Sequence, residues 1–363
     1  MTGENRQMIS MKEIGRICGV AESTVSKALR GHAGIKLATR ERIQEVARQY
    51  GYQPNAMVEC MQTGKSRSIG IACNNFQCQF SGAIMDGIHQ ALHEYGYDSY
   101  VISWDRLVKD GVDLLSRFSR RRVDGLLLLP MGEPPSPSHI AQLHGFHNPV
   151  VLIDQVWGSC DFDYVGTDNR AAMAALVEEL IGRGYRKIGA VLFSRVSSGE
   201  ERRAGFLDAM FRHRLPVDGR FLCEAGNSRY GNYDQIRTLL SAADRPEALV
   251  CFNDYLANDA LNAAHDLGIR VPEELAITGF GNLPLCEKLR PQLSTADQQA
   301  ETIGRTAARL LLERITGGET GPRREIRLPA QPVLRGSVGG REAPAAHKPE
   351  TAGDRRLLRR ATC

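Results

Sequence analysis

Apolar residues in the first fifty positions recur three and four residues apart, the spacing of amphipathic helices. Ser10 followed by Glu13 has the spacing of a capping box, which predicts a helix start there, and Gly19 predicts its end. A second helix is expected from about Glu22, and a third from about Thr39 to Tyr50. The residues expected to face inward are Met11, Ile14, Ile17, Cys18, Val25, Ala28, Leu29, Ile43, Val46 and Ala47. Three short helices, the first two joined by a glycine turn, predict a helix-turn-helix unit.

From Ser68 the pattern changes to short apolar runs that alternate with amphipathic segments. Such alternation predicts parallel sheets covered by helices, and about 270 residues are too many for one small α/β layer. We therefore expect an all-α head followed by an α/β body with two parallel-sheet subdomains. The expected strands are 69–72, 97–103, 125–130, 150–154, 188–193, 248–252 and 275–279, and the expected helices include 82–95, 170–182, 202–212 and 255–267.

Length and composition divide the chain further. It has 363 residues, of which 42% are hydrophobic and 24% charged, values typical of a soluble protein with more than one domain. No apolar run approaches the ~20 residues of a membrane helix, and the start lacks a secretory apolar segment, so we expect a cytoplasmic protein. The expected parts are a helix-turn-helix domain at 1–54, a short helix and linker at 55–66, a body with two α/β subdomains at 67–336 and a disordered basic tail at 337–363.

Charge is distributed unevenly along the chain. Residues 1–65 hold 10 Lys and Arg against 6 Asp and Glu, whereas residues 66–336 hold 30 against 33. A basic head on a slightly acidic body favours a polyanionic partner at the head. The last 27 residues hold 6 basic against 3 acidic residues, which favours a solvated tail and leaves a nucleic-acid role open.

Neither a metal site, a cofactor site nor an enzyme motif is expected. The nine cysteines are scattered without a Cys-x-x-Cys pair, which favours buried thiols over zinc binding. His144 and His147 have no third ligand nearby and are expected to be solvated loop residues. No Gly-x-Gly-x-x-Gly after a strand, no Gly-x-Ser-x-Gly and no phosphate loop occurs.

Two sets of motifs in the same order resemble the lactose-repressor (LacI/GalR) family, up to about Arg335. They are 19–20, 24–26, 39–43, 51–55 and 68–70 in the head, and 165–169, 184–188, 202–206, 253–254, 267–272 and 277–280 in the body. The resemblance implies a homodimer on palindromic double-stranded operator DNA. It also implies a body of the periplasmic sugar-binding-protein type, whose cleft takes a small-molecule effector, namely a sugar, sugar acid or polyol. The implied function is a ligand-responsive, sequence-specific regulator, a repressor of carbohydrate-related genes; the alternative is a sugar-binding protein without DNA-dependent regulation.

The second helix of such a unit lies in the major groove. Ser23, Lys27 and Arg30 are polar positions on its outer face that can reach base edges or phosphates, while Thr24 and Ser26 are expected to bind phosphate or hold the helix. The alternative is an amphipathic helix pair that binds no nucleic acid. Relatives commonly have Ser caps where this chain has Ala21 and Lys36.

The segment 55–62 resembles the family's hinge helix, whose implied DNA contacts are Asn55, Val58 and the apolar wedge Met61. The alternative is that this segment is a plain linker.

For the effector, the resemblance implies contacts from Phe80, Asp154, Arg202 and Asn253, with Asp254 as a neighbouring helix cap, all at strand ends or loop starts. Gly281 occupies the position where relatives commonly hold sugar hydroxyls with an Asp. A glycine side chain accepts no hydrogen bond, so the cleft keeps the donors of Arg202 but loses an acceptor. We therefore expect an acid or a short polyol rather than an unmodified hexose, unless Asn282 or a water replaces that acceptor.

Overall fold

The computed structural model describes residues 9–53, 60–61, 63–73, 78–103, 114–130, 137–158, 160–226, 232–317 and 321–340. The chain separates into two compact units, a head (Met1–Arg67) and a body (Ser68–Cys363). Of the predicted hinge residues, Asn55 and Val58 lie outside the described residues. None of the helices in the described ranges combines the length and apolar character that crossing a bilayer requires.

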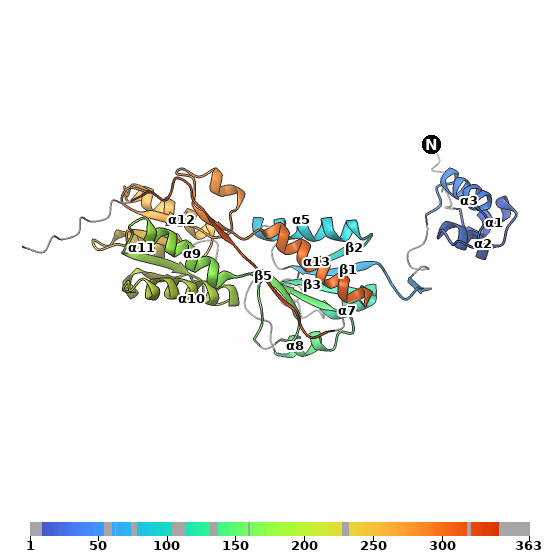
Figure 1. Cartoon of the computed structure of the whole chain (residues 1–363), viewed down its shortest axis with the longest axis horizontal. Coiled ribbons are helices and arrows are strands. Elements are labelled where there is room, and N and C mark those ends of the chain that lie inside the picture. Colours follow the sequence, from blue (N-terminus) through green and yellow to red (C-terminus); the bar gives the residue numbers. More distant parts are fainter. Residues whose placement is uncertain are drawn as a thin grey trace, which may run out of the picture. The chain divides into compact units, whose positions relative to one another are not determined.

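The head contains three helices, α1 (Met11–Cys18), α2 (Glu22–Leu29) and α3 (Leu37–Gln49), as Figure 1 shows. The predicted capping box is present, because Glu13 N donates to Ser10 Oγ and Ser10 N donates to the Glu13 carboxylate. Gly19 ends α1 in the left-handed conformation. Ile17, predicted to face inward, is 39% exposed. The small core consists of Ile14, Cys18, Val25, Ala28, Ile43 and Ala47.

The first lobe of the body is built on a six-stranded parallel sheet with the order β11-β5-β4-β3-β1-β2. Helices α5 and α13 lie side by side against one face (Figure 1), where the backbones of Gly87 and Gly304 allow close approach. The strands are β1 (Ser68–Cys73), β2 (Asp98–Ser103), β3 (Gly125–Leu129), β4 (Val150–Ile153), β5 (Asp163–Thr167) and β11 (Glu325–Leu328), and the helices are α5 (Gln79–Glu94), α7 (Leu114–Arg121), α8 (Pro137–His144) and α13 (Ala300–Thr316).

The second lobe is built on a four-stranded parallel sheet with the order β7-β6-β8-β9. Two short antiparallel strands, β10 (Thr295–Asp297) and β12 (Gln331–Val333), pair beside it. The other strands are β6 (Ile188–Leu192), β7 (Leu222–Glu224), β8 (Ala248–Cys251) and β9 (Ala276–Thr278), and the helices are α9 (Asn169–Gly182), α10 (Ser197–Arg212), α11 (Tyr233–Ser241), α12 (Asp254–Asp266) and the short η1 (Gly219–Phe221) and η2 (Pro284–Glu287).

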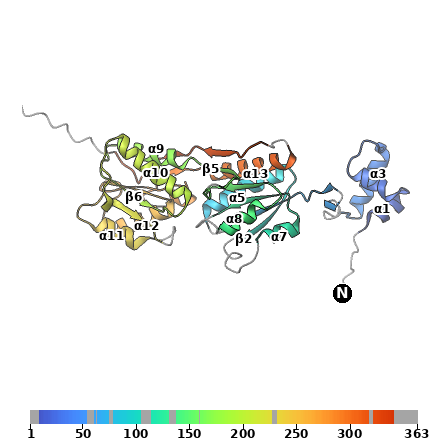
Figure 2. The same ribbon diagram turned by 90° about the horizontal axis from the view of Figure 1, so that it is seen from below.

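Three chain segments connect the lobes: β5 to α9, β10 to α13 and β11 to β12. They are hydrogen bonded to one another, since Asp168 N donates to Leu328 O and Gln299 Nε2 donates to Pro329 O. Figure 2 shows the orange-red chain after α13 passing from one lobe to the other. One hydrophobic core draws residues from both lobes, among them Ile153 and Cys251, so the lobes share packing below the cleft.

The body extends further than the sequence predicts. Ser337 and Val338, assigned in advance to a disordered tail from 337 on, are buried, and Ser337 Oγ donates to Ile277 O. Residues 337–340 therefore belong to the body, while 341–363 lie outside the described residues. Both predicted parallel-sheet subdomains are present. The long helix α13 was not among the predicted helices, although its apolar positions do recur at helical spacing.

Candidate functional site

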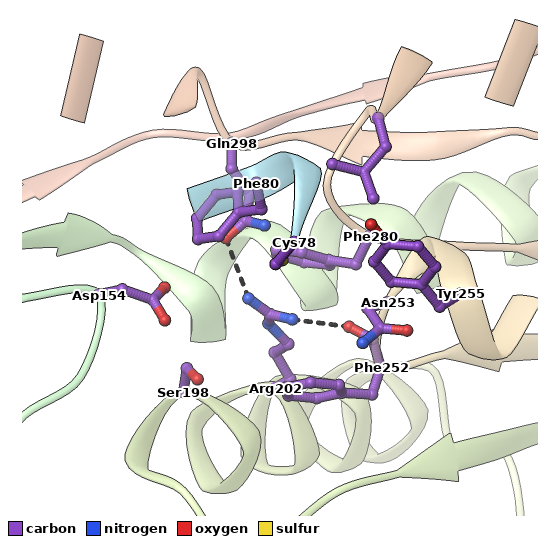
Figure 3. Close-up of a pocket in the computed structure, with 11 residues that line it drawn as sticks. Cys78, Phe80, Asp154, Ser198, Arg202, Phe252, Asn253, Tyr255, Phe280 and Gln298 are labelled. Carbon is purple, nitrogen blue, oxygen red and sulfur yellow. Dashed lines mark hydrogen bonds between the residues drawn. The ribbon is translucent and has the colours of Figure 1, made fainter. Parts of the chain in front are cut away.

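A pocket of about 420 Å³, part of it open to solvent, lies between the two lobes of the body (Figure 3). Cys78 and Phe80 at the start of α5, and Asp154 after β4, come from the first lobe. Most of the remaining wall comes from the second lobe. The lining residues are Cys78, Phe80, Asp154, Ser198, Arg202, Phe252, Asn253, Tyr255, Phe280, Leu283 and Gln298.

Arg202 is only 3% exposed, and the residues around it engage its guanidinium. Its Nε donates to Asn169 Oδ1 at 2.8 Å, Nη1 to the backbone oxygen of Phe252 at 2.6 Å and Nη2 to Gln298 Oε1 at 3.0 Å. The prediction that Arg202 lies at a strand end or loop start was wrong, because α10 begins five residues earlier at Ser197. Arg202 therefore forms part of the pocket wall, and each of its three guanidinium nitrogens donates a hydrogen bond to a neighbouring residue.

Two aromatic rings enclose the same guanidinium. The Arg202 carbon Cζ lies 3.9 Å from the ring centre of Phe280 and 4.5 Å from that of Phe252. Cation–π contacts of this kind stabilise most where water is excluded. The rings and the hydrogen bonds together fix the position of Arg202, which in turn fixes Gln298.

Other polar groups remain available inside the pocket. Because Arg202 can only donate, the oxygen of the Gln298 amide must face it, and this leaves the amide nitrogen on the other side. Within the described ranges, neither Gln298 Nε2 nor Ser198 Oγ has a hydrogen-bond partner. Asp154 points its carboxylate toward the interior of the pocket (Figure 3). The pocket thus offers both donors and acceptors to a ligand.

Asp154 stands in a left-handed conformation, with φ of 69°, directly after β4. Its backbone oxygen accepts a hydrogen bond from the Tyr164 hydroxyl at 3.2 Å. Burial, and next the charge of Asp154, raise the pKa of Tyr164 well above its ordinary value, so this hydroxyl stays a donor. The side chain of Asp154 is therefore aimed by a strained turn that a buried tyrosine holds in place.

The cap of α12 differs from the prediction. Asn253, not Asp254, is the N-cap residue, and its Oδ1 accepts from Leu256 N at 2.9 Å. Asp254 is the first helical residue and is fully buried behind the pocket wall, where it accepts from Leu283 N at 2.9 Å and Thr295 Oγ1 at 2.6 Å. Burial raises the pKa of the Asp254 carboxyl, an effect that these hydrogen bonds oppose.

Gly281 does not line the pocket; its neighbours Phe280 and Leu283 do. Its φ is 142°, and a Cβ atom there would lie 2.9 Å from Asp254 Oδ2. A Cβ at Gly279 would also collide with Asp254. Asn282, considered as a replacement acceptor, is already engaged, because its Oδ1 accepts from Arg335 Nη2 at 2.8 Å. Gly281 is thus required by the packing of Asp254.

Two hydrogen bonds join the lobes beside the pocket. Gln79 N, in the first lobe, donates to the Tyr255 hydroxyl of the second at 3.2 Å. Val156 N donates across to Ser197 Oγ at 2.9 Å. The two lobes therefore touch each other beside the pocket, as they must if they are to enclose a ligand.

In the head, Ser23 and Lys27 are exposed on α2, while Thr24 and Ser26 are half-buried. Arg30 lies just beyond the helix, which ends at Leu29, and its Nη2 donates to Ser26 Oγ at 2.8 Å. As expected, neither Ala21 nor Lys36 provides a side-chain cap. Met61 is 75% exposed. The exposed face of α2 is thus basic and polar.

Within the described residues no group of His, Cys, Asp and Glu side chains is arranged to hold a metal. His144, expected in a loop, instead ends α8 and stacks on Phe162 with ring centres 4.6 Å apart. The described cysteines are free thiols, and all of them except the half-buried Cys223 are buried.

Four residues that the sequence identifies as effector contacts meet in the pocket: Phe80, Asp154, Arg202 and Asn253. Seven further lining residues could not be identified from the sequence. Gln298 and Ser198 sit in polar stretches that have no pattern of their own, and the aromatic residues of the second lobe follow strands that look like ordinary core. The missed residues are Cys78, Ser198, Phe252, Tyr255, Phe280, Leu283 and Gln298.

Two family models match the chain: bacterial regulatory proteins, lacI family, over residues 10–55, and a periplasmic binding protein-like domain over residues 177–338. Among curated proteins, the chain is 28% identical over 314 residues to the HTH-type transcriptional repressor PurR of Salmonella paratyphi B. That match spans 85% of this chain and 91% of the relative.

Solved structures of transcriptional regulators are also similar to this chain. A LacI family transcriptional regulator from Enterococcus faecium with bound ribose is 26% identical, with a TM-score of 0.67 over 76% of this chain and 100% of the other. The lac repressor dimer bound to operator and the anti-inducer ONPF shares the fold, with a TM-score of 0.80 at 19% identity over 92% of this chain and 99% of the other.

Proposed function

We propose that this chain, which carries a LacI-family helix-turn-helix region and a periplasmic binding protein-like domain, is a repressor that binds operator DNA as a homodimer and responds to a small hydroxylated ligand. The observation that carries the proposal is the presence, in one chain, of a helix-turn-helix head and a polar pocket between two lobes. The relatives named above are regulators, and we propose that this chain likewise works as a regulator in the cytoplasm rather than as an enzyme.

For DNA, the proposal places α2 in the major groove. Ser23, Lys27 and Arg30 would contact base edges or phosphates, with Thr24 and Ser26 nearer the backbone. In the hinge, Asn55, Val58 and Met61 would meet the minor groove, where an exposed Met side chain can open a base step.

For the effector, the pocket chemistry favours a neutral sugar or polyol. Phe80 offers an apolar face, while Asp154, Ser198, Asn253 and Gln298 offer acceptors and donors for hydroxyl groups. An acid is less favoured than expected, because each guanidinium nitrogen of Arg202 donates a hydrogen bond to Asn169, Phe252 or Gln298. Gly281 lies outside the pocket lining, so its missing carboxylate removes no acceptor from this wall.

The proposal is tested by letting the full-length protein select duplexes from a random-sequence library while a panel of sugars, polyols and sugar acids is screened by thermal shift. We expect enrichment of a two-fold symmetric sequence and stabilisation by a neutral compound. A ligand at 100 times its dissociation constant stabilises by about 2.7 kcal/mol, which such a screen detects. Ligand stabilisation without any enriched duplex would instead identify a sugar-binding protein without DNA-dependent regulation.

A further inference from the structure

Helix α7 and the residue after it carry four arginines within six positions: Arg117, Arg120, Arg121 and Arg122. All four are exposed. Positions 117, 120 and 121 are three and four residues apart, so they share one face of the helix. The helix is anchored by Phe118, which is fully buried and packs edge-on against Tyr100. The arginines are therefore displayed by a helix whose rotation is fixed.

Among the described residues, these guanidinium groups have no acidic partner. In the described part of the chain none of the four makes an ion pair, and the contact of Arg121 is with the Tyr100 ring at 5.2 Å. Most of the described surface arginines of the body, by contrast, are paired with acids, for example Arg170 with Asp208 and Arg327 with Glu201. The body as a whole carries slightly more acidic than basic residues. Within the described residues, α7 thus carries a cluster of exposed arginines without acidic partners.

The arginines lie where the body begins. Asp124 N, two residues beyond Arg122, donates to the backbone oxygen of Ser68, the first residue of the body. Both α7 and the start of β1 lie at the same end of the first lobe (Figure 1). The roughly 14 residues between Gln53 and Ser68 span at most about 50 Å when extended. DNA held by the head therefore stays within a short tether of these arginines, which raises its effective concentration there.

We propose that Arg117, Arg120, Arg121 and Arg122 bind phosphates of the DNA that flanks the operator, so that the body itself contributes to DNA affinity. This inference rests on the proposed function as a DNA-binding regulator. Duplex DNA carries one negative charge per about 1.7 Å, and arginine is well suited to phosphate because its planar fork donates two parallel hydrogen bonds. The contact adds affinity without sequence preference, since phosphates carry no base identity.

The test compares two duplexes that contain the selected operator, one limited to the operator and one extended by about 20 base pairs on each side. That extension, roughly 68 Å, exceeds the reach of the linker. Affinity is measured as a function of salt for the full-length protein, the variant Arg117→Gln/Arg120→Gln/Arg121→Gln, and a matched control, Arg203→Gln/Arg214→Gln/Arg237→Gln. The control removes three exposed arginines of the second lobe.

We expect the wild type and the control to show a steeper salt dependence on the extended duplex, and the α7 variant to lose that difference. Each lost phosphate contact changes the log–log slope by ~0.9, so two contacts amount to about tenfold in affinity between 50 and 200 mM salt. The double variant Arg117→Gln/Arg120→Gln, which keeps the contact of Arg121 with Tyr100, guards against a folding defect. Equal slopes for the wild type and the α7 variants on the extended duplex would overturn the proposal. If the wild type bound neither duplex specifically, the proposed function would fail first.

Discussion

The pocket and the DNA-facing surfaces use cations in opposite ways. In the pocket, Arg202 is buried and gives its hydrogen bonds to Asn169, Phe252 and Gln298. On α2 and α7, Lys27 and Arg117 are exposed and have no acidic partner in the described part of the chain. A buried cation must be satisfied internally because its desolvation is costly, whereas an exposed one remains solvated until an anion replaces water. A buried cation such as Arg202 therefore has a structural role in its site, whereas an exposed cation such as Lys27 can bind an anionic partner.

The largest effect is expected from Arg202→Met. The change leaves three buried acceptors without their charged donor, and breaking such a cluster costs about 4 kcal/mol. Urea unfolding of the full-length protein measures the loss. Arg203→Met on the same helix is the control, because Arg203 is exposed. Equal stabilities of the two variants would mean that Arg202 does not hold the pocket together.

Gly281→Ala is expected to destabilise the body by about 2–3 kcal/mol. The new Cβ meets Asp254 Oδ2 at 2.9 Å, and the φ of 142° is one that side chains rarely adopt. Gly82→Ala is the matched control, since Gly82 lies inside α5 and a Cβ there meets nothing within 4 Å. Thermal unfolding of both variants decides whether Gly281 is structural. A neutral Gly281→Ala would restore the earlier interpretation of this position as a lost ligand acceptor.

Lys27→Ala is expected to weaken operator binding by about 2 kcal/mol and nonspecific binding by less. The reason is that an unpaired cation on the exposed face of α2 can donate to a base edge. Fluorescence anisotropy on the selected duplex and on a scrambled one gives both affinities. Lys12→Ala, on the exposed side of α1, is the control. Equal losses on both duplexes would show that Lys27 contacts phosphate alone.

Ser10→Ala is expected to cost the head about 1 kcal/mol, because it removes the hydroxyl that caps α1. The hydrogen bonds involved are exposed, so the loss should be far smaller than for Arg202. Ser23→Ala, in the first turn of α2, should leave stability nearly unchanged. Circular dichroism during urea unfolding measures both, and a loss as large as that of Arg202→Met would contradict the role assigned to burial.

The same capping box predicts a pH dependence. The backbone and hydroxyl of Ser10 hold the pKa of the Glu13 carboxyl below its ordinary 4.5. A lowered pKa in the folded state adds stability above the ordinary value, and this stability is lost as pH falls through the lowered pKa. The melting temperature of the head should therefore decline below about pH 4.5, and Ser10→Ala should flatten that decline. An identical decline in both proteins would exclude the Ser10 hydroxyl as a cause and leave the backbone hydrogen bond of residue 10.

The sequence predicted the head and most strands of the parallel sheets because helix caps and apolar runs are local signals. It did not predict β5, β7, β10, β11 and β12. Of these, β7, β10 and β12 are only three residues long, which is too short for an alternating pattern. Gly281 was misinterpreted for a different reason: the side chain that excludes a Cβ there, Asp254, is 27 residues away in the sequence. Which donors of Arg202 are engaged likewise depends on residues that only the fold brings together.

The central claim is that one chain couples a ligand in the pocket to DNA at the head. The most direct test measures affinity of the full-length dimer for the selected duplex with and without the compound that stabilises it in the thermal-shift screen. Allosteric coupling of about 1–3 kcal/mol predicts a change of roughly 5- to 150-fold, in either direction. The account predicts such a change, and the same affinity with saturating ligand as without it would contradict ligand-responsive regulation.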